Sequence, residues 1–540
     1  SRAAKAFGSW VPQVAPRVIA LLTFMAGSVL VLSGATPALV RRVALLRTLV
    51  PLPVMEASHF LGSLAGILLL ILARGLQRRL DAAYVLTGLL LVGGAAASLL
   101  KGLDYEEAVF LMVLFLALLP CRKYFYRKSS LLAPTFSPGW ITATALVLLG
   151  AAWLGYFSFK HVDYRHELWW SFAFRGDASR FLRASVGIGV AMVAFAAAHL
   201  LRPAPPEPAP PAPEELARAA GIVAASPSAG AHLALLGDKS LFFSESGASF
   251  LMYGVAGRSW VVMGDPVGPE EEHAELLWRF REQVDRHDGW PVFYEVGTEH
   301  LPLYLDLGLT LVKVGEEAVV DLEPFTLDGS GRKTLRHLRN KLEKEGWRFD
   351  IHPASAVPDL LPELKRVSDA WLEGKRTREK GFSLGYFDPA YLARTPVAAV
   401  SREGRLVAFA NVWMGASREE LSVDLMRTAP EAPPGIMDYL FIHLLLWGRE
   451  QGYRRFNLGM APLAGLESRA LAPLWTRIGA FLFRTGEHYY NFQGVRQYKA
   501  KFDPRWEPRY IASPGGISLA PVLASIASLV GRGLRGVVAR

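Results

Sequence analysis

The feature that most constrains the fold is the uncharged apolar run at residues 18–40. At a rise of about 1.5 Å per residue, a helix of this length spans the hydrocarbon core of a bilayer. A cleavable signal peptide is the competing interpretation, but the run is long and five more apolar runs follow it. They lie at 57–73, 82–100, 108–121, 139–159 and 184–201. We therefore predict a polytopic α-helical membrane domain of about six helices over residues 1–201.

The lysines and arginines that flank these runs predict how the domain is oriented. They are slightly more numerous on the side that carries the N-terminus, which places that side in the cytoplasm. An even number of crossings returns the chain to the same side. The second half of the chain is therefore predicted to be cytoplasmic. A proline-rich stretch, residues 202–213, separates the two halves as a semi-rigid linker.

The balance of charged and metal-binding residues narrows the range of partners. A formal net charge of +10 favours anionic partners, which are phospholipid headgroups, nucleic acid or both. The single cysteine, Cys121, excludes an internal disulfide and a cysteine-rich metal site. His300, His337 and His352 lack the spacing of metal ligands. The sequence also contains no G-x-x-x-x-G-K-[ST] phosphate-binding loop. We predict neither a metal nor a cofactor.

Residues 214–510 alternate helix and strand patterns, which is typical of an α/β domain. Two similar units, 214–350 and 351–510, suggest an internal duplication of one fold. The first unit ends in a basic helix at 331–345. Residues 511–540 carry arginines, no acidic residue and an apolar run, so we interpret them as a basic amphipathic tail that rests on anionic lipid. A disordered tail is the alternative.

The segment from 421 to 460 is the best candidate for a functional site. The pattern of Leu421–Arg427 predicts a strand, which a Pro-Pro-Gly turn ends. An apolar helix follows, with Asp438 as its N-cap and Gly452 as its C-cap. The helix leads to a second strand, which we expect to be parallel to the first. Ligands of open α/β sheets bind at the carboxyl ends of such strands. Asp424 lies near that end and shares one face with Arg427 only if a β-bulge intervenes, so we predict a bulge. A surface ion pair is the alternative.

Four stretches carry a family resemblance. They are 367–392 (VSDAWLEGKRTREKGFSLGYFDPAYL), 421–427 (LSVDLMR), 453–466 (YRRFNLGMAPLAGL) and 494–510 (GVRQYKAKFDPRWEPRY). These residues resemble the bacterial aminoacyl-phosphatidylglycerol synthases, the multiple peptide resistance factor family. The resemblance implies two tandem acetyltransferase-like folds and a multi-pass protein of the bacterial inner membrane.

The resemblance also implies a reaction. An aminoacyl group, lysyl or alanyl, moves from aminoacyl-tRNA to the glycerol hydroxyl of phosphatidylglycerol. The product lowers the negative charge of the membrane and confers resistance to cationic antimicrobial peptides. Because aminoacyl-tRNA is already an activated ester, such a reaction needs no ATP. Its predicted partners are aminoacyl-tRNA and anionic lipid, including phosphatidylglycerol. The sequence does not decide whether the protein forms a homo-oligomer.

The resemblance implicates four residues in activity, namely Asp424, Arg427, Tyr391 and Lys499. A cation at Arg427 or Lys499 can hold a phosphate or stabilise an oxyanion, and Asp424 can contact an α-ammonium or orient the hydroxyl. Core packing of Tyr391 and a solvated Lys499 are the alternatives. Ser383 and Ser422 have no neighbouring histidine in a nucleophile pattern, so direct attack by the lipid hydroxyl is the simpler mechanism.

Two further groups complete the predicted site. The substrate-binding group comprises Lys375, Arg376, Ser383, Asn457, Met460 and Tyr498. The tRNA- or phosphate-binding group lies on the basic helix and comprises Arg332, Lys333, Arg336 and Arg339. A solvated charged face is the alternative for the cluster that contains Lys375 and Arg376, and contact with the membrane is the alternative for the basic helix. The glycine turns at 237–239 and 264–268 are interpreted as tight loops only.

Two other functions compete with this interpretation. A membrane-anchored acyl-CoA-dependent acyltransferase would use the same fold. It would hold pyrophosphate at the start of the helix after the Pro-Pro-Gly turn, where two prolines and Asp438 are unfavourable. A lipid-translocating or lipid-binding membrane protein is the third interpretation. Charges within the membrane would favour it, but the apolar runs contain almost none.

Overall fold

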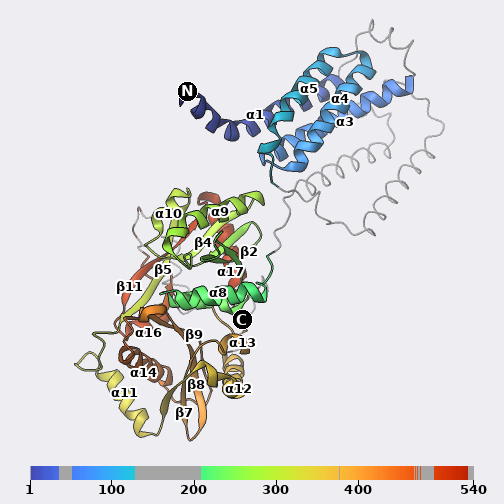
Figure 1. The fold of residues 1–540 in the computed structure, drawn as a ribbon. Helices are drawn as coiled ribbons and strands as arrows, with labels where there is room; N and C mark the ends of the chain where they lie inside the picture. The colour runs from blue at the N-terminus through green and yellow to red at the C-terminus, as the bar shows by residue number, and fades with distance from the viewer. Residues whose placement is uncertain are drawn as a thin grey trace, which may run out of the picture. The chain divides into compact units, whose positions relative to one another are not determined.

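The computed structural model describes residues 2–35, 52–127, 208–375, 378–466, 469, 471, 475 and 492–532. The chain forms two compact units (Figure 1). The apolar runs predicted to cross the membrane at 139–159 and 184–201 lie outside the described residues.

The N-terminal unit is helical. Its described helices are α1 (Arg2–Ala35), α3 (Leu52–Gln77), α4 (Asp81–Gly102), α5 (Tyr105–Leu118) and the 3-10 helix η1 (Leu119–Tyr124). Two segments, Val14–Val31 in α1 and Asp81–Leu100 in α4, are long and apolar enough to cross a membrane. Each of the first four predicted runs is helical over most of its described residues, and the fourth ends in the 3-10 helix.

The apolar residues of this unit also cover its outside. Leu21, Leu89, Val113 and Leu116 are each more than half exposed. Water disfavours an apolar exterior of this kind, whereas lipid tails solvate it. Inside the unit, a Cβ on Gly27 would lie 2.7 Å from the Gly66 carbonyl oxygen, so these glycines permit a close α1–α3 crossing.

Within the described residues, the second unit is built on one sheet of eleven strands in the order β1-β2-β3-β4-β11-β5-β10-β9-β8-β7-β6. The strands are β1 (Ser240–Phe243), β2 (Phe250–Ala256), β3 (Ser259–Met263), β4 (Trp290–Val296), β5 (Thr310–Asp321), β6 (Arg348–His352), β7 (Val397–Arg402), β8 (Arg405–Met414), β9 (Glu420–Thr428), β10 (Arg455–Pro462) and β11 (Arg505–Ser513). The helices are α8 (Pro213–Ala225), α9 (His273–Arg286), α10 (Leu301–Asp306), α11 (Lys333–Lys344), α12 (Val357–Lys375), α13 (Pro389–Leu392), α14 (Ile436–Glu450), α16 (Phe492–Ala500) and α17 (Leu519–Val530).

The predicted duplication is visible in the topology. In the first half, β1, β2 and β3 form an antiparallel meander, and α9 leads to β4, which is parallel to β3. In the second half, β7, β8 and β9 form the meander, and α14 leads to β10, which is parallel to β9. Both halves therefore repeat one meander and one helical crossover, as expected of tandem acetyltransferase-like folds.

The two halves exchange their last strands. The first half ends in β5, which pairs with β10 of the second half, and the second half ends in β11, which pairs with β4 of the first. β5 and β11 also pair with each other in antiparallel register from Arg505↔Val319 to Ser513↔Thr310. The result is one continuous sheet, with no break in pairing at the boundary near residue 350 that the sequence suggested.

Helix α14 begins earlier than predicted. Gly435 is its N-cap with a φ of 86°, and a Cβ at this position would lie 2.8 Å from the Leu338 side chain. Asp438 is therefore a first-turn residue, whose carboxylate accepts hydrogen bonds from Lys501 at 2.9 and 3.2 Å instead of capping the helix. Gly452 has a φ of 78° just after the helix, in agreement with the predicted C-terminal glycine.

The C-terminal helix α17 corrects another expectation. Its Val522 and Ile526 are buried, and the helix packs against β2. The backbone N–H of Gly381 donates to the carbonyl of Val530 at 3.0 Å, which ties the loop before α13 to the end of α17. The apolar side that was predicted to rest on lipid is thus occupied by the sheet.

The exchange of strands predicts cooperative unfolding. Ile511 lies on β11, the second-half strand that is inserted between β4 and β5 of the first half, and it is 1% exposed. Ile511→Ala should therefore lower the free energy of unfolding by about 2–5 kcal/mol. Because β5 and β11 connect the halves, both should unfold in a single transition. Urea denaturation of residues 208–540, monitored by both fluorescence and circular dichroism, measures the free energy of unfolding and the number of transitions. The matched control is Ile517→Ala, whose side chain is 99% exposed. Two separate transitions would contradict the prediction.

Candidate active site

The site begins at a β-bulge in β9. In the pairing with β8, Val412 lies opposite Val423 and Ala410 lies opposite Met426, so Asn411 faces two residues, Asp424 and Leu425. The amide oxygen of the Asn411 side chain accepts a hydrogen bond from the Leu425 N–H at 2.8 Å. This bond replaces the backbone hydrogen bond that the Leu425 N–H loses at the bulge. The predicted bulge is confirmed.

Two other segments donate hydrogen bonds to Asp424, and a third segment supports one of these donors. The Tyr391 hydroxyl donates to one carboxylate oxygen at 2.7 Å, and the backbone N–H of Gly385 donates to the other at 2.7 Å. The indole N–H of Trp413 in turn donates to the Tyr391 oxygen at 2.9 Å. Burial raises the pKa of Asp424, while these two donors and the nearby cations Lys239 and Arg427 lower it. Tyr391 therefore orients a carboxylate and does more than fill the core.

Arg427 is buried beside this carboxylate. The residue is 8% exposed, and its Nη2 donates to Glu379 Oε2 at 2.7 Å. Its guanidinium lies 4.2 Å from the centre of the Trp371 ring. Asp424 and Arg427 also influence each other's pKa, which places them near one another. The alternative of a surface ion pair at the strand end is wrong because solvent does not surround these groups.

Lys239 is a member of the site that sequence reasoning missed. It is 1% exposed, and it forms an ion pair with Asp238, whose other oxygen accepts the Phe382 N–H at 3.1 Å. Phe382 itself has a φ of 61°, a left-handed conformation rare for a bulky residue. Asp424 also raises the pKa of Lys239, so the two charges lie close. The turn at 237–239 thus brings a cation from the first half to the acid of the second.

The three carboxylates of this group have different partners. Asp238 pairs with Lys239 and Glu379 pairs with Arg427, and the Arg532 side chain also lies beside Asp238. Asp424 instead accepts its two hydrogen bonds from neutral groups, the Tyr391 hydroxyl and the Gly385 amide. Asp424 is therefore the carboxylate of this group that neutral donors hold in place.

Lys499 lies in a second polar group at the centre of the sheet. Its ammonium donates to the Met460 carbonyl at 2.8 Å, and burial lowers its pKa to about 8, although Glu317 and Glu295 act in the opposite direction. Glu317 also pairs with Arg509. The alternative of a solvated surface lysine is therefore wrong.

The Met460 end of β10 is irregular. The pairing of β10 with β5 shifts between Asn457 and Met460, and Gly459 has a φ of 81° at the shift. The Asn457 amide oxygen accepts the Gly459 N–H at 2.8 Å, and the Asn457 carbonyl accepts the Ser422 hydroxyl at 2.9 Å. Asn457 therefore shapes the strand that presents the Met460 carbonyl.

Glu295 is the second residue that sequence reasoning missed. It lies on β4 where the pairing with β11 shifts between Val296↔Tyr510 and Tyr294↔Ile511, and its φ is 63°. Burial and the neighbouring Glu317 raise its pKa from 4.5 to about 7, while Tyr294, Arg509 and Lys499 lower it. A strained, non-glycine residue in the interior of a sheet is a frequent feature of functional sites.

The remaining predicted substrate-binding residues do not lie in one place. Lys375 is exposed and lines a cavity together with Tyr498. Ser383 lies in the loop that also supplies the Gly385 amide to Asp424, and Arg376 lies outside the described residues.

The basic helix α11 is less available for RNA than its sequence suggests. Arg332 donates to the carbonyls of Lys501 and Phe502, and Arg336 donates to those of Leu327 and Gly329. Arg339 pairs with Glu343 at 2.8 Å, and Lys333 is exposed. Two of the four predicted phosphate ligands therefore stabilise the ends of neighbouring segments. Within the residues that the structure describes, no group of three or more side chains could hold a metal ion.

Two exchanged α/β halves around a buried carboxylate, arginine and lysine define a tandem acetyltransferase-like unit. The family model for phosphatidylglycerol lysyltransferase, C-terminal, matches residues 222–513. The phosphatidylglycerol lysyltransferase of Bacillus subtilis (strain 168) is 34% identical over 528 residues, which are 95% of this chain and 59% of that protein. The enzyme of the same name from Staphylococcus aureus (strain MSSA476) is 36% identical over 300 residues, which are 55% of this chain and 36% of that protein. The chain belongs to the phosphatidylglycerol lysyltransferase family.

Two solved structures agree with this assignment. The C-terminal domain of an Agrobacterium fabrum protein named as a lysylphosphatidylglycerol synthetase is 43% identical, with a TM-score of 0.55. It covers 60% of this chain and is itself 99% covered. The structure named L-PGS from Bacillus licheniformis is 38% identical with a TM-score of 0.53 and covers 60% of this chain, with 98% of its own length matched. The chain spans about three-fifths of the length of the Bacillus subtilis relative and about a third of the staphylococcal ones.

The raised pKa of Glu295 predicts a pH dependence of stability. Between pH 4.5 and about 7 the folded state retains a proton that the unfolded state has released, so the free energy of unfolding falls as pH rises through this window. Glu295→Gln should remove this part of the decline. Urea denaturation of residues 208–540 at several pH values measures it against the exposed control Glu299→Gln. Parallel stability curves for wild type and Glu295→Gln would contradict the assignment.

Proposed function

We propose that this chain transfers an aminoacyl group, lysyl or alanyl, from aminoacyl-tRNA to the glycerol hydroxyl of phosphatidylglycerol. The observation that carries the proposal is the buried Asp424 carboxylate, which the neutral donors Tyr391 and Gly385 hold in place. An aminoacyl ester carries an α-ammonium, and a buried, oriented carboxylate holds such a cation beside the reacting carbonyl. Membership in the phosphatidylglycerol lysyltransferase family supports the same substrate class.

The proposed step exchanges one ester for another. The glycerol oxygen attacks the aminoacyl carbonyl carbon, the bond to the ribose oxygen breaks, and the hydroxyl proton ends on that ribose oxygen. Asp424, fixed by Tyr391 and Gly385, holds the α-ammonium. Lys499, whose pKa is lowered to about 8, is charged at neutral pH and stabilises the developing oxyanion or the lipid phosphate. No redox partner or nucleotide triphosphate is needed.

The N-terminal unit is proposed to hold the enzyme in the bacterial inner membrane. Its apolar exterior and its two helices of membrane-spanning length support this role. We further propose that the catalytic unit faces the cytoplasm, where aminoacyl-tRNA is available. Aminoacylation adds an ammonium to each lipid headgroup, which lowers the negative charge of the membrane and its attraction for cationic antimicrobial peptides.

The direct test uses the purified chain in phosphatidylglycerol vesicles, supplied separately with tRNA charged with radiolabelled lysine, alanine or arginine. Label in the lipid fraction from one donor would support the reaction and identify the amino acid. If folded protein transfers label from none of them, the proposal is wrong. Parallel reactions with acyl-CoA donors then test the acyltransferase interpretation.

Asp424→Asn should lower kcat/KM for transfer by roughly 100-fold or more, because the site loses the charge that holds the α-ammonium. The same substitution should lower the free energy of unfolding by about 1–3 kcal/mol, because an amide nitrogen replaces one of the two oxygens that accept from Tyr391 and Gly385. Activity and urea denaturation are measured together, with exposed Asp350→Asn as the control. A stable Asp424→Asn variant with wild-type activity would refute the assignment.

A further inference from the structure

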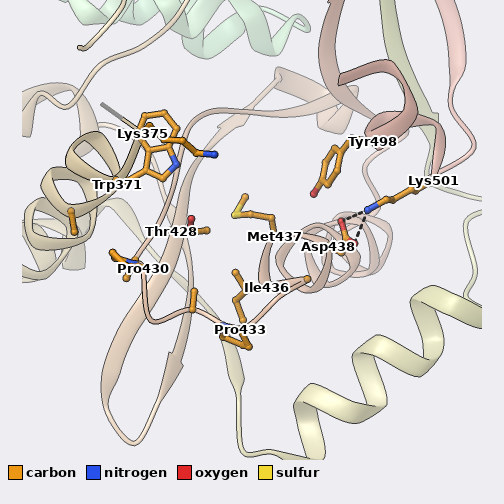
Figure 2. Close-up of a pocket in the computed structure, with 15 residues that line it drawn as sticks. Trp371, Lys375, Thr428, Pro430, Pro433, Ile436, Met437, Asp438, Tyr498 and Lys501 are labelled. Atoms are coloured by element: carbon orange, nitrogen blue, oxygen red, sulfur yellow. Dashed lines mark hydrogen bonds and ion pairs between the residues drawn. The ribbon is translucent and has the colours of Figure 1, made fainter. Parts of the chain in front are cut away.

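A cavity of about 530 Å³ lies beside the candidate active site. It opens between the end of α12, the β9–α14 connection, the first turn of α14 and the segment that follows α16 (Figure 2). We call it the α14 pocket. Its size is in the range of sites that bind a nucleoside or another small molecule.

The α14 pocket adjoins the reacting groups. Trp371 lines the pocket and also carries the Arg427 guanidinium, 4.2 Å from its ring centre. Thr428, the last residue of the strand that carries Asp424 and Arg427, lines the pocket as well. A ligand that packs on Trp371 is therefore one side chain away from Arg427.

The lining suits a planar base with a phosphate attached. Figure 2 shows Trp371 and Lys375 on one side of the α14 pocket and Tyr498 and Lys501 on the other, with Met437 between them. Aromatic rings and a thioether provide faces on which a base packs, and base–aromatic stacking is worth about 1–3 kcal/mol per base. The exposed ammonium of Lys375 is suited to a phosphate at the rim.

Asp438 does not oppose an anionic ligand in this setting. Its carboxylate accepts both contacts from Lys501, at 2.9 and 3.2 Å, so the pair is neutral together. With Lys375 included, the lining carries one excess positive charge. The unfavourable effect that Asp438 has in the sequence is therefore removed by Lys501. A lipid tail would offer no partner to the Lys375 ammonium at the rim.

We propose that the α14 pocket holds the 3′-terminal nucleotide of the aminoacyl-tRNA donor, with its base against Trp371, Met437 and Tyr498 and its phosphate at Lys375. This inference rests on the proposed function. In every aminoacyl-tRNA the ester is carried by the ribose of that terminal adenosine. A base in the pocket consequently places the ester toward Arg427 and Asp424, and the pocket positions the donor while contributing nothing to lipid binding.

The test measures KM separately for charged tRNA and for phosphatidylglycerol, using the full chain in vesicles. Lys375→Glu should raise KM for the donor about 10-fold and reduce the salt dependence of donor kcat/KM by about one unit of log–log slope. Met437→Glu, in the floor of the pocket, should raise donor KM similarly. KM for phosphatidylglycerol should stay constant in both. Lys365→Glu is the matched control, because Lys365 is an exposed lysine on the same helix that pairs with Asp369 outside the pocket.

Competition identifies the occupant. A CCA trinucleotide should inhibit the wild-type chain competitively against charged tRNA, and Met437→Glu should weaken this inhibition. If wild type transfers label but both variants keep the wild-type donor KM, the inference is wrong while the proposed function stands. A raised KM for phosphatidylglycerol instead, or inhibition by coenzyme A without inhibition by CCA, also overturns it. Absence of transfer by wild type rejects the proposed function itself.

Discussion

The antiparallel pairing of β5 with β11 is the interaction on which the rest of the catalytic unit depends. Each of these strands ends one half of the duplicated fold and lies against the crossover strand of the other half. The exchange removes two sheet edges that separate halves would expose. It also places Glu295 of β4, Glu317 of β5 and Lys499 near one another. Neither half contains this polar group alone, which is a physical reason for the two copies to remain on one chain.

The polar residues of the site lie where regular pairing fails. The strands β4, β10 and β9 each shift register at one place, beside Glu295, Gly459 and Asp424 respectively. In a regular interior strand, side chains alternate between two packed faces, and a charge there has no access to a polar neighbour. A bulge redirects one side chain without ending the strand. The cost of desolvating these charges is evident in the raised pKa values of Asp424 and Glu295. This part of the fold therefore gives up stability for chemistry.

Local patterns predicted much of this structure, because residue type and spacing strongly favour particular strands and turns. The bulge was predicted from the spacing of Asp424 and Arg427 together with the premise that both residues face one cleft. Partners distant in sequence were not predictable in this way. Glu379 is 48 residues from Arg427, and Lys239 belongs to a turn whose composition indicates only a tight loop. The prediction for the C-terminal helix α17 was wrong for a related reason. Its apolar side could pack on β2 or on lipid, and the sequence does not distinguish the two.

The distribution of charge fits the proposed donor. The net charge of +10 belongs to the whole molecule, and it favours the approach of anions over distances near the Debye length. At the candidate site, Asp424 is a buried carboxylate that Tyr391 and Gly385 hold in place. In the proposed reaction this carboxylate would attract the α-ammonium of the donor, while the positive net charge of the molecule would attract the tRNA phosphates. This difference in sign would orient the donor, with its phosphates outside and its amino acid inside.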